Sequence, residues 1–166
     1  MKGQRHFRGF AFALIGAGCL SAGCSDTHAT ARPDFSSCDR VAILCSALTR
    51  DKEEGFIPLY MDAFPNQHLV DGRDVQAIVG DEAMTQGQTP DEQTRSKLLR
   101  SLGVKAIVYP SDTGRQFAIK VIDTKTGEIL AAVVISGHEV WSGDNLGYKD
   151  LVEKAIGALK DKAGST

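Results

Sequence analysis

Apolar residues fall into short blocks along the chain, separated by Gly, Pro and Asp, and the spacing within each block indicates a strand or a helix. Residues 41–45 form a continuous apolar run, which is typical of a strand buried on both faces. Residues 104–109, 117–122 and 129–135 predict three more strands. A tight turn over 123–127 joins the last two, so these three strands are expected to form a meander.

The segment between the first strand and residue 80 has the least regular pattern. Pro58 is expected to open a short helix, because proline is tolerated in the first turn, with the charged residues 51–54 in the loop before it. A brief strand is expected at 68–70. From Asp71 onward, apolar residues recur at helical spacing, which predicts a helix with one buried side.

Residues 89–92 carry the clearest local signal in the chain. The run Thr-Pro-Asp-Glu has a cap residue, a proline at the first helical position and a glutamate at the third, which is the pattern of a capping box. Gly103 is expected to end this helix in the left-handed conformation. Gly127 is expected to sit in the tight turn between two strands, and a last helix is predicted at about 146–160.

Helices interleaved with strands, followed by a meander and a closing helix, predict an α/β domain with a mixed sheet of four to five strands. The chain after its first segment is long enough for one domain with a single core and too short for two. Residues 38–166 are therefore expected to fold as one unit.

Residues 9–24 are apolar and rich in Gly and Ala, and three interpretations compete for them. A dinucleotide-binding turn needs a third glycine, where Ser21 stands, and a helix after it, where a polar stretch with Pro33 follows. A transmembrane helix needs about 20 predominantly apolar residues, and this run is shorter. A basic head without acidic residues precedes the run, which is the layout of a signal peptide over 1–23.

Residues 20–24, Leu-Ser-Ala-Gly-Cys, resemble the lipobox of bacterial lipoproteins, in which small residues admit the peptidase and the cysteine thiol takes the diacylglycerol. Cys24 is therefore expected to be the lipidated first residue of the mature chain. Cys19 is a second candidate, and an ordinary cleaved signal is the remaining alternative. Ser25 follows Cys24, whereas aspartate there retains lipoproteins in the inner membrane of enteric bacteria, so the outer membrane is expected.

The stretch 24–37 is small, polar and interrupted by a proline, and it is expected to be a flexible tether. Such a tether spans about 20 Å on average and about 45 Å at full stretch. This reach is too short for a domain that must act through the cell-wall layer from the outer membrane.

Charge narrows the set of partners. Removing residues 1–23 takes three basic residues and no acidic ones, which leaves 16 Lys and Arg against 21 Asp and Glu, a formal charge of −5. This balance argues against nucleic acid, which needs a basic face. It also gives no attraction to anionic lipid, so the membrane anchor is expected to be covalent.

Cys38 and Cys45 are the cysteines that follow the signal, and an oxidising periplasm would favour a disulfide between them. Seven residues in an extended strand span roughly 20 Å. A disulfide needs Cα atoms within about 7 Å, so the bridge is disfavoured unless the chain before the strand doubles back.

The sequence holds no serine-hydrolase elbow, zinc-protease helix or P-loop. His138 and Glu139 are the one adjacent pair of a histidine and a carboxylate, and no third ligand lies at metal spacing. Trp141 marks either a contact surface or a cap on the core. Two further carboxylate pairs, Asp71 with Asp74 and Asp81 with Glu82, are explained as charges at helix starts, which the helix dipole favours. No catalytic residue, metal site or cofactor is expected, and the protein is predicted not to be an enzyme.

Two short motifs nevertheless resemble a known family. Leu-Gly-Val-Lys-Ala at 102–106 and Asp-x-x-Thr-Gly-Glu at 123–128 are similar to the domain shared by the curli secretion-channel lipoprotein CsgG, the penicillin-binding-protein activator LpoB and the amino-terminal domain of TolB. The match covers about 70–137 and is weaker before it. The resemblance implies a three-layer α/β domain, held at the outer membrane by a lipid and used for protein contacts. The first helix is shorter here, and the channel's membrane-spanning hairpins have no counterpart.

The leading hypothesis is therefore a lipid-anchored, periplasm-facing protein of the outer membrane whose domain binds another envelope protein as an assembly or accessory factor. One alternative is an LpoB-like activator of a peptidoglycan synthase, which the short tether disfavours. Another is an accessory subunit of a secretion or surface-structure apparatus. An envelope enzyme is the last alternative, opposed by the missing acid–base constellation.

Overall fold

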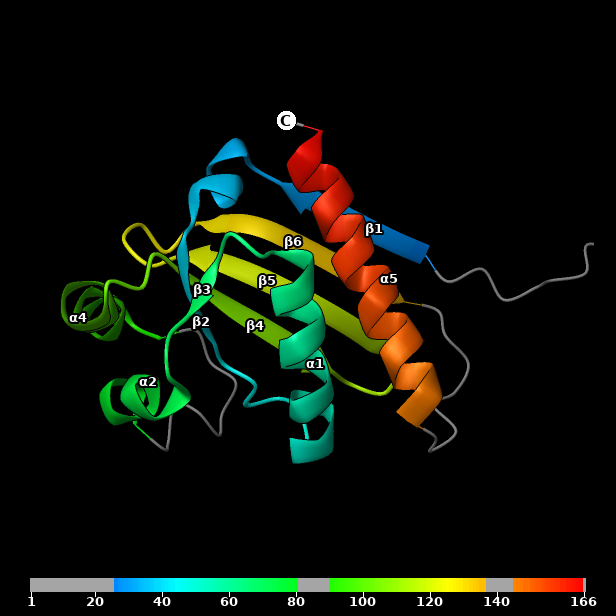
Figure 1. The fold of residues 1–166 in the computed structure, drawn as a ribbon, viewed down its shortest axis with the longest axis horizontal. Helices are drawn as coiled ribbons and strands as arrows, with labels where there is room; N and C mark the ends of the chain where they lie inside the picture. The colour runs from blue at the N-terminus through cyan, green and yellow to red at the C-terminus, as the bar shows by residue number, and fades with distance from the viewer. Residues whose placement is uncertain (1–25, 81–89, 137–144, 166) are drawn as a thin grey trace, which may run out of the picture.

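The computed structural model describes residues 26–80, 90–136 and 145–165. A six-stranded mixed sheet, with strands in the order β1-β6-β5-β4-β2-β3, carries helices on both faces (Figure 1). The α/β fold with three layers is as predicted, and the sheet has six strands instead of four to five. In chain order the elements are β1 (Asp26–Ala31), η1 (Pro33–Ser37), β2 (Arg40–Ile43), α1 (Arg50–Ala63), β3 (His68–Leu69), α2 (Gly72–Val79), α4 (Glu92–Leu102), β4 (Ala106–Asp112), β5 (Gln116–Asp123), β6 (Ile129–Ser136) and α5 (Asn145–Gly164).

The sheet has a parallel part and an antiparallel part. Strand β2 runs parallel to both of its neighbours, β3 and β4. Strands β4, β5 and β6 form the predicted antiparallel meander, and β1 adds to β6 in antiparallel register. Two buried clusters fill the space between the layers. The larger lies under α1, α5 and η1, and the smaller lies under α2 and α4.

Alternation along the central strands explains this division. Successive side chains of a strand point to opposite faces, so Val108 joins the larger cluster while Ile107 joins the smaller. Helix α5 covers the first face with one apolar side, as its spacing predicted. Its buried residues are Tyr148, Leu151, Val152, Ala155, Ile156 and Leu159.

The prediction of a flexible tether over 24–37 is wrong for residues 26–37. Asp26 to Ala31 form the edge strand β1, and each residue pairs with one on β6. The 3-10 helix η1 follows and inserts Phe35, which is 1% exposed, into the larger cluster. The sequence Asp-Thr-His-Ala-Thr-Ala carries almost no apolar signal, so only the tertiary pairing with β6 makes this segment a strand.

The first helix was also predicted too short. Helix α1 begins at Arg50, and Pro58 lies inside it instead of opening it. A proline within a helix removes one backbone hydrogen bond and costs about 3 kcal/mol. Phe56 and Tyr60, on either side of Pro58, are both fully buried against the sheet and α5, and their burial offsets that cost.

Helix α4 has the predicted end and a different start. The capping box at Thr89 does not form the cap, because Asp91 is the cap residue and its Oδ1 accepts a hydrogen bond from the Thr94 amide at 2.7 Å. This hydrogen bond from the Thr94 amide, and after it a hydrogen bond with the Thr94 side chain, hold the pKa of Asp91 below its usual value. Gly103 ends the helix with φ 66°, and its amide donates to the carbonyl of Leu99, which confirms the left-handed cap.

Candidate interaction surface

Several residues singled out in the sequence lie outside the described part of the chain. They are Cys19, Cys24, Asp81, Glu82, His138, Glu139 and Trp141. Asp71 is described, and it caps α2 by accepting a hydrogen bond from the Arg73 amide at 2.8 Å. Asp74 lies in the first turn of the same helix. The helix-start interpretation of these two carboxylates therefore fits their positions.

Cys38 and Cys45 are free, buried thiols at the two ends of β2. The Cys38 thiol donates to the carbonyl oxygen of Asp34 at 3.5 Å. Burial raises the pKa of Cys38, and it raises the pKa of Cys45 to about 12. A thiol is a nucleophile only as the thiolate, so both side chains are poorly reactive at neutral pH.

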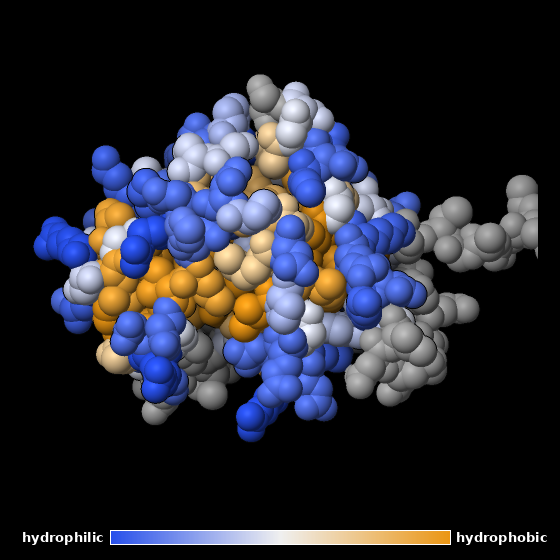
Figure 2. Space-filling model, viewed as in Figure 1, coloured by the Kyte–Doolittle hydropathy of each residue, from blue (hydrophilic) through white to orange (hydrophobic). Residues whose placement is uncertain are grey.

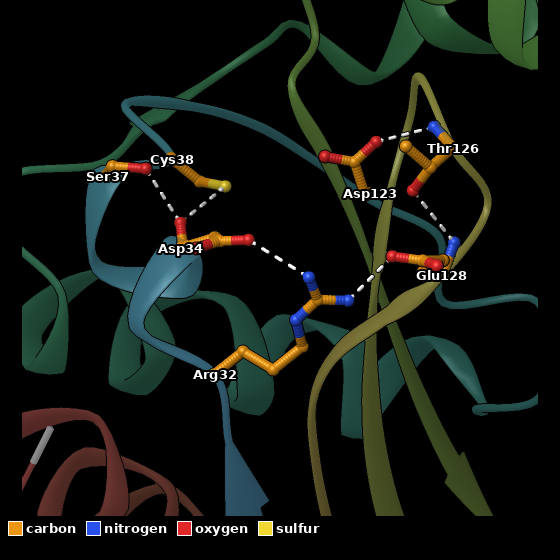
Figure 3. Close-up of polar contacts among 7 residues, drawn as sticks. All are labelled: Arg32, Asp34, Ser37, Cys38, Asp123, Thr126 and Glu128. Atoms are coloured by element: carbon orange, nitrogen blue, oxygen red, sulfur yellow. Dashed lines mark hydrogen bonds and ion pairs between the residues drawn. The ribbon is translucent and has the colours of Figure 1, made fainter.

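The Asp-x-x-Thr-Gly-Glu motif builds the turn between β5 and β6 (Figure 3). Asp123 accepts a hydrogen bond from the Thr126 amide at 2.6 Å, and the Thr126 hydroxyl accepts one from the Glu128 amide at 3.2 Å. Gly127 adopts φ 75°, a conformation that glycine reaches without steric cost. The Asp, Thr and Gly residues of the motif thus specify a turn, as the sequence predicted.

Glu128 has a further role that the sequence did not indicate. Its carboxylate lies 2.6 Å from the guanidinium of Arg32, which also contacts Asp34 at 3.1 Å (Figure 3). The backbone amide of Arg32 donates to the carbonyl of Leu130 at 2.7 Å. These contacts fasten the junction of β1 and η1 to the start of β6. The motif therefore both makes a turn and holds the amino-terminal segment on the sheet.

A shallow apolar cavity of about 330 Å³ lies beside this network, where α1, α5 and η1 come together. We call it the η1 groove. Phe64 packs edge-on against Phe35, with ring centroids 5.3 Å apart, and against Tyr60 at 4.8 Å. The residues that line the η1 groove include Phe35, Ala63, Phe64, Pro65, Ala163 and Gly164. An apolar concavity at a surface is the usual form of a site for a protein partner's side chain.

A second cavity of about 330 Å³ lies on the other sheet face, beyond the cover of α2 and α4. It is more polar, with Ser111, Gln116 and Lys120 among its lining residues. The buried hydroxyl of Tyr109, also in its wall, has no hydrogen-bond partner among the described residues. Burial raises the pKa of this hydroxyl, so it remains a neutral donor.

The opposite end of the sheet from the η1 groove is held by a partly buried ion pair. The ammonium of Lys52 on α1 contacts the carboxylate of Asp112, the last residue of β4, whose side chain is 2% exposed. The same ammonium lies 5.3 Å from the ring centroid of Tyr148 on α5. Asp112 also accepts a hydrogen bond from the Gly114 amide at 2.7 Å. Three elements distant in sequence are thereby joined.

Apolar atoms also reach the surface between α1 and α4, whereas hydrophilic side chains cover α5 (Figure 2). The short edge strand β3 lies in this region, and its Leu69 is 39% exposed. Leu69 and Ile129 are the exposed large hydrophobic residues of the described chain. An exposed apolar residue on a sheet edge is a contact point that a neighbouring molecule can cover.

Residues 26–80, 90–136 and 145–165 contain neither a metal site nor a membrane-spanning helix. No group of three side chains among them could ligate a metal ion. None of the helices built from these residues has the length and the apolar character needed to cross a membrane. What the described surface offers is the apolar η1 groove, a second and more polar cavity on the other sheet face, and an apolar edge at β3.

An α/β domain of this kind is found in known proteins. No family model matches the chain, and no curated protein matches it in sequence. Among solved structures, the PelC dodecamer from Paraburkholderia phytofirmans aligns with a TM-score of 0.50 and 11% identity, over 82% of this chain and 99% of that one. At this identity the likeness shows a shared fold.

Two weaker matches accompany it. A variant PelC dodecamer from the same organism aligns with a TM-score of 0.46 and 11% identity, over 84% of this chain and 95% of that one. The lipoprotein GNA1162 from Neisseria meningitidis aligns with a TM-score of 0.38 and 14% identity, over 70% of this chain and 92% of that one. The specific resemblance to CsgG, LpoB and TolB stays a prediction.

Proposed function

We propose that the protein is a lipoprotein anchored through Cys24 in the outer membrane, whose domain serves as an accessory or assembly factor for a protein apparatus of the envelope. Its partner is another envelope protein, bound through the described surfaces. The fold shared with PelC, a dodecamer, supports a role in which several copies act together. No reaction is assigned to the domain.

The observation that carries this proposal is the position of β1. The strand begins at Asp26, only two residues after Cys24. Two residues span at most about 7 Å. A domain anchored in this way stays at the surface of its own membrane, and the reach is even shorter than the sequence suggested. Local assembly is therefore favoured over activation of a synthase in the inner membrane.

Metabolic labelling with an alkyne analogue of palmitate tests the anchor. The unchanged protein and Cys19→Ala are expected to incorporate the label and to fractionate with the outer membrane. Cys24→Ala is expected to lose both properties. Label that persists in Cys24→Ala and disappears in Cys19→Ala would move the anchor to Cys19. An unlabelled wild-type protein would exclude lipid anchoring.

The partner is tested by crosslinking in intact cells. A photo-crosslinking amino acid at Phe64 in the η1 groove, or at Lys120 on the open sheet face, is expected to capture an outer-membrane or periplasmic protein. Residues 26–166, which include β1, provide the soluble domain for a second assay. Stimulation of the organism's bifunctional peptidoglycan synthases by this domain, together with crosslinks to such a synthase, would favour the activator alternative instead.

A further inference from the structure

We infer that the end of the sheet at which β1 begins lies against the membrane, so that the exposed β4–β5 turn contacts lipid head groups while the η1 groove points away. The inference rests on the proposed anchor at Cys24. It adds which part of the domain touches lipid and which part is presented to a partner.

The first step is the length of the link. Acyl chains on Cys24 lie in the bilayer, and Asp26 is already part of the sheet. The backbone between them spans at most about 7 Å, less than the thickness of a head-group layer together with a solvated loop. The start of β1 is therefore held at the lipid surface.

The second step is the register of the neighbouring strands. Asp26 lies opposite Ser136 on β6, and Ser136 lies opposite Gln116 on β5. Neighbouring strands are about 4.8 Å apart, so Gln116 lies roughly 10 Å from Asp26 across the sheet and at the same level. The turn 113–116 immediately precedes this level and is exposed throughout. The start of β1 and this turn therefore lie at the same end of the sheet.

The third step is the rigidity of that turn. Asp112 anchors it through the Lys52 ammonium and the Gly114 amide. Helix α1, which carries Lys52, begins at this end of the domain and reaches the η1 groove with Ala63. Helix α5 likewise ends at the groove, with Gly164. Helices α1 and α5 thus run from the end of the domain with the β4–β5 turn to the end with the η1 groove.

The η1 groove lies at the far end of β1. Six residues of strand rise about 20 Å at about 3.3 Å per residue, and η1 follows directly. The Arg32–Glu128 contact fixes η1 to the sheet at that height. In the inferred orientation, with β1 running away from the membrane, the groove lies about 20 Å above the lipid, where a protein partner can reach it.

Charge does not set this orientation. Cations described near the lipid-facing end have acidic residues beside them: Arg50 pairs with Glu54 at 3.1 Å, Lys52 with Asp112, and Lys149 with Glu153 at 3.6 Å. Such a mixed surface has no strong attraction to anionic head groups, and its interactions are screened within about 8 Å at physiological salt. The short link holds this end of the sheet at the lipid without the help of charge, so lipid contact is expected to depend little on ionic strength.

Fluorescence quenching in vesicles tests the inference. The lipidated protein is reconstituted into phosphatidylethanolamine–phosphatidylglycerol vesicles that contain a head-group nitroxide lipid, with an environment-sensitive dye on a single introduced cysteine. Dye is placed at Arg115→Cys in the turn, at Lys125→Cys in the β5–β6 turn, and at Lys120→Cys on the open sheet face. The unsubstituted protein is the background control, because its two described cysteines are buried.

The dye at position 115 is expected to lose most of its fluorescence, while the dyes at 120 and 125 lose little. Equal quenching at all three positions, or stronger quenching at 120 or 125, overturns the inference while leaving the anchor intact. Protein that fails to float with the vesicles overturns both the anchor and the inference. The two failures are therefore distinguishable.

A longer link provides the matched control. Twelve Gly and Ser residues inserted between Ser25 and Asp26 leave the anchor and the folded domain unchanged. Flotation is expected to persist while most of the quenching at position 115 is lost, because the domain is then free to move away from the lipid. Unchanged quenching after the insertion overturns the short link as the cause of the orientation.

Discussion

Gly127 shows how a single position in the chain can serve two constraints at once. It has φ 75°, and a Cβ atom built there would lie 2.7 Å from a guanidinium nitrogen of Arg95. Arg95 in turn donates a hydrogen bond to the carbonyl of Pro90 at 2.9 Å. The Asp-x-x-Thr-Gly-Glu motif could be predicted to form a turn from sequence, but the packing of Arg95 could not, because 32 positions separate the two residues.

Gly127→Ala is expected to destabilise the domain by about 2 kcal/mol, since it adds displacement of Arg95 to the cost of about 1 kcal/mol for a left-handed Ala. Gly103→Ala is expected to lose only the free energy of a left-handed Ala, because the atom nearest to its added Cβ is the Arg40 Nε at 3.5 Å. Gly157→Ala, inside α5 with open space around it, serves as the control and is expected to stabilise slightly. Urea unfolding of residues 26–166 measures all three. Equal losses at 103 and 127 would contradict the role of Arg95.

Asp112 is the second position where a substitution is informative. Asp112→Asn removes the counter-charge of the Lys52 ammonium, whose side chain is 33% exposed, and we expect a loss of about 2 kcal/mol in the free energy of unfolding. Asp34→Asn breaks the exposed pair with Arg32 and is expected to cost less than about 1 kcal/mol. Urea unfolding compares the two. A loss at Asp112 no larger than that at Asp34 would show that the Lys52 pair is as weak as a surface one.

At the scale of elements, β1 depends on the rest of the fold. Its small side chains give no local drive to form a strand, and its six pairings with β6 and its packing under α5 supply the stability instead. Once formed, it covers the edge of β6, which would otherwise present unpaired backbone groups to other molecules.

A fragment that begins at Asp34 and so lacks β1 is therefore expected to unfold at a lower urea concentration than one that begins at Asp26. It is also expected to aggregate, because the edge of β6 is uncovered. Unfolding curves and light scattering of the two fragments give the comparison. A fragment from Asp34 that is as stable and as soluble as the longer one would show that β1 contributes nothing to the domain.

The elements also show what the sequence could and could not reveal. The β4–β6 meander and the end of α4 carry local signals, alternating apolar residues and a capping glycine, and both are as predicted. The start of α1 and the strand β1 depend on partners distant in sequence. Pro58 predicted a helix start where the helix continues, and the small, polar residues of β1 predicted a flexible segment where packing makes a strand. The η1 groove was missed for the same reason, since three separate elements form it.

At the scale of the whole molecule, the proposal that several copies act together can be tested at the apolar edge at β3. If several copies act together as proposed, the lipidated form in detergent has a mass several times that of one chain. Leu69→Lys, which places a charge on the exposed edge, is expected to reduce that mass. Ile129→Lys, at the other exposed apolar residue, is the control and is expected to leave it unchanged. Light scattering coupled to size exclusion measures the mass, and a monomeric wild type would contradict self-assembly.

The attachment of β1 to the anchor also has a mechanical consequence. A pull on the distal end of the domain, resisted by the lipid, is transmitted along the axis of β1 to its ladder with β6. The six residue pairs of that ladder are then loaded in shear, so they must yield together and not one after another. A strand loaded in this direction withstands far more force than one peeled from its end. The lipid should therefore leave the bilayer before the strand leaves the sheet, and a partner that strains against this protein would extract it folded.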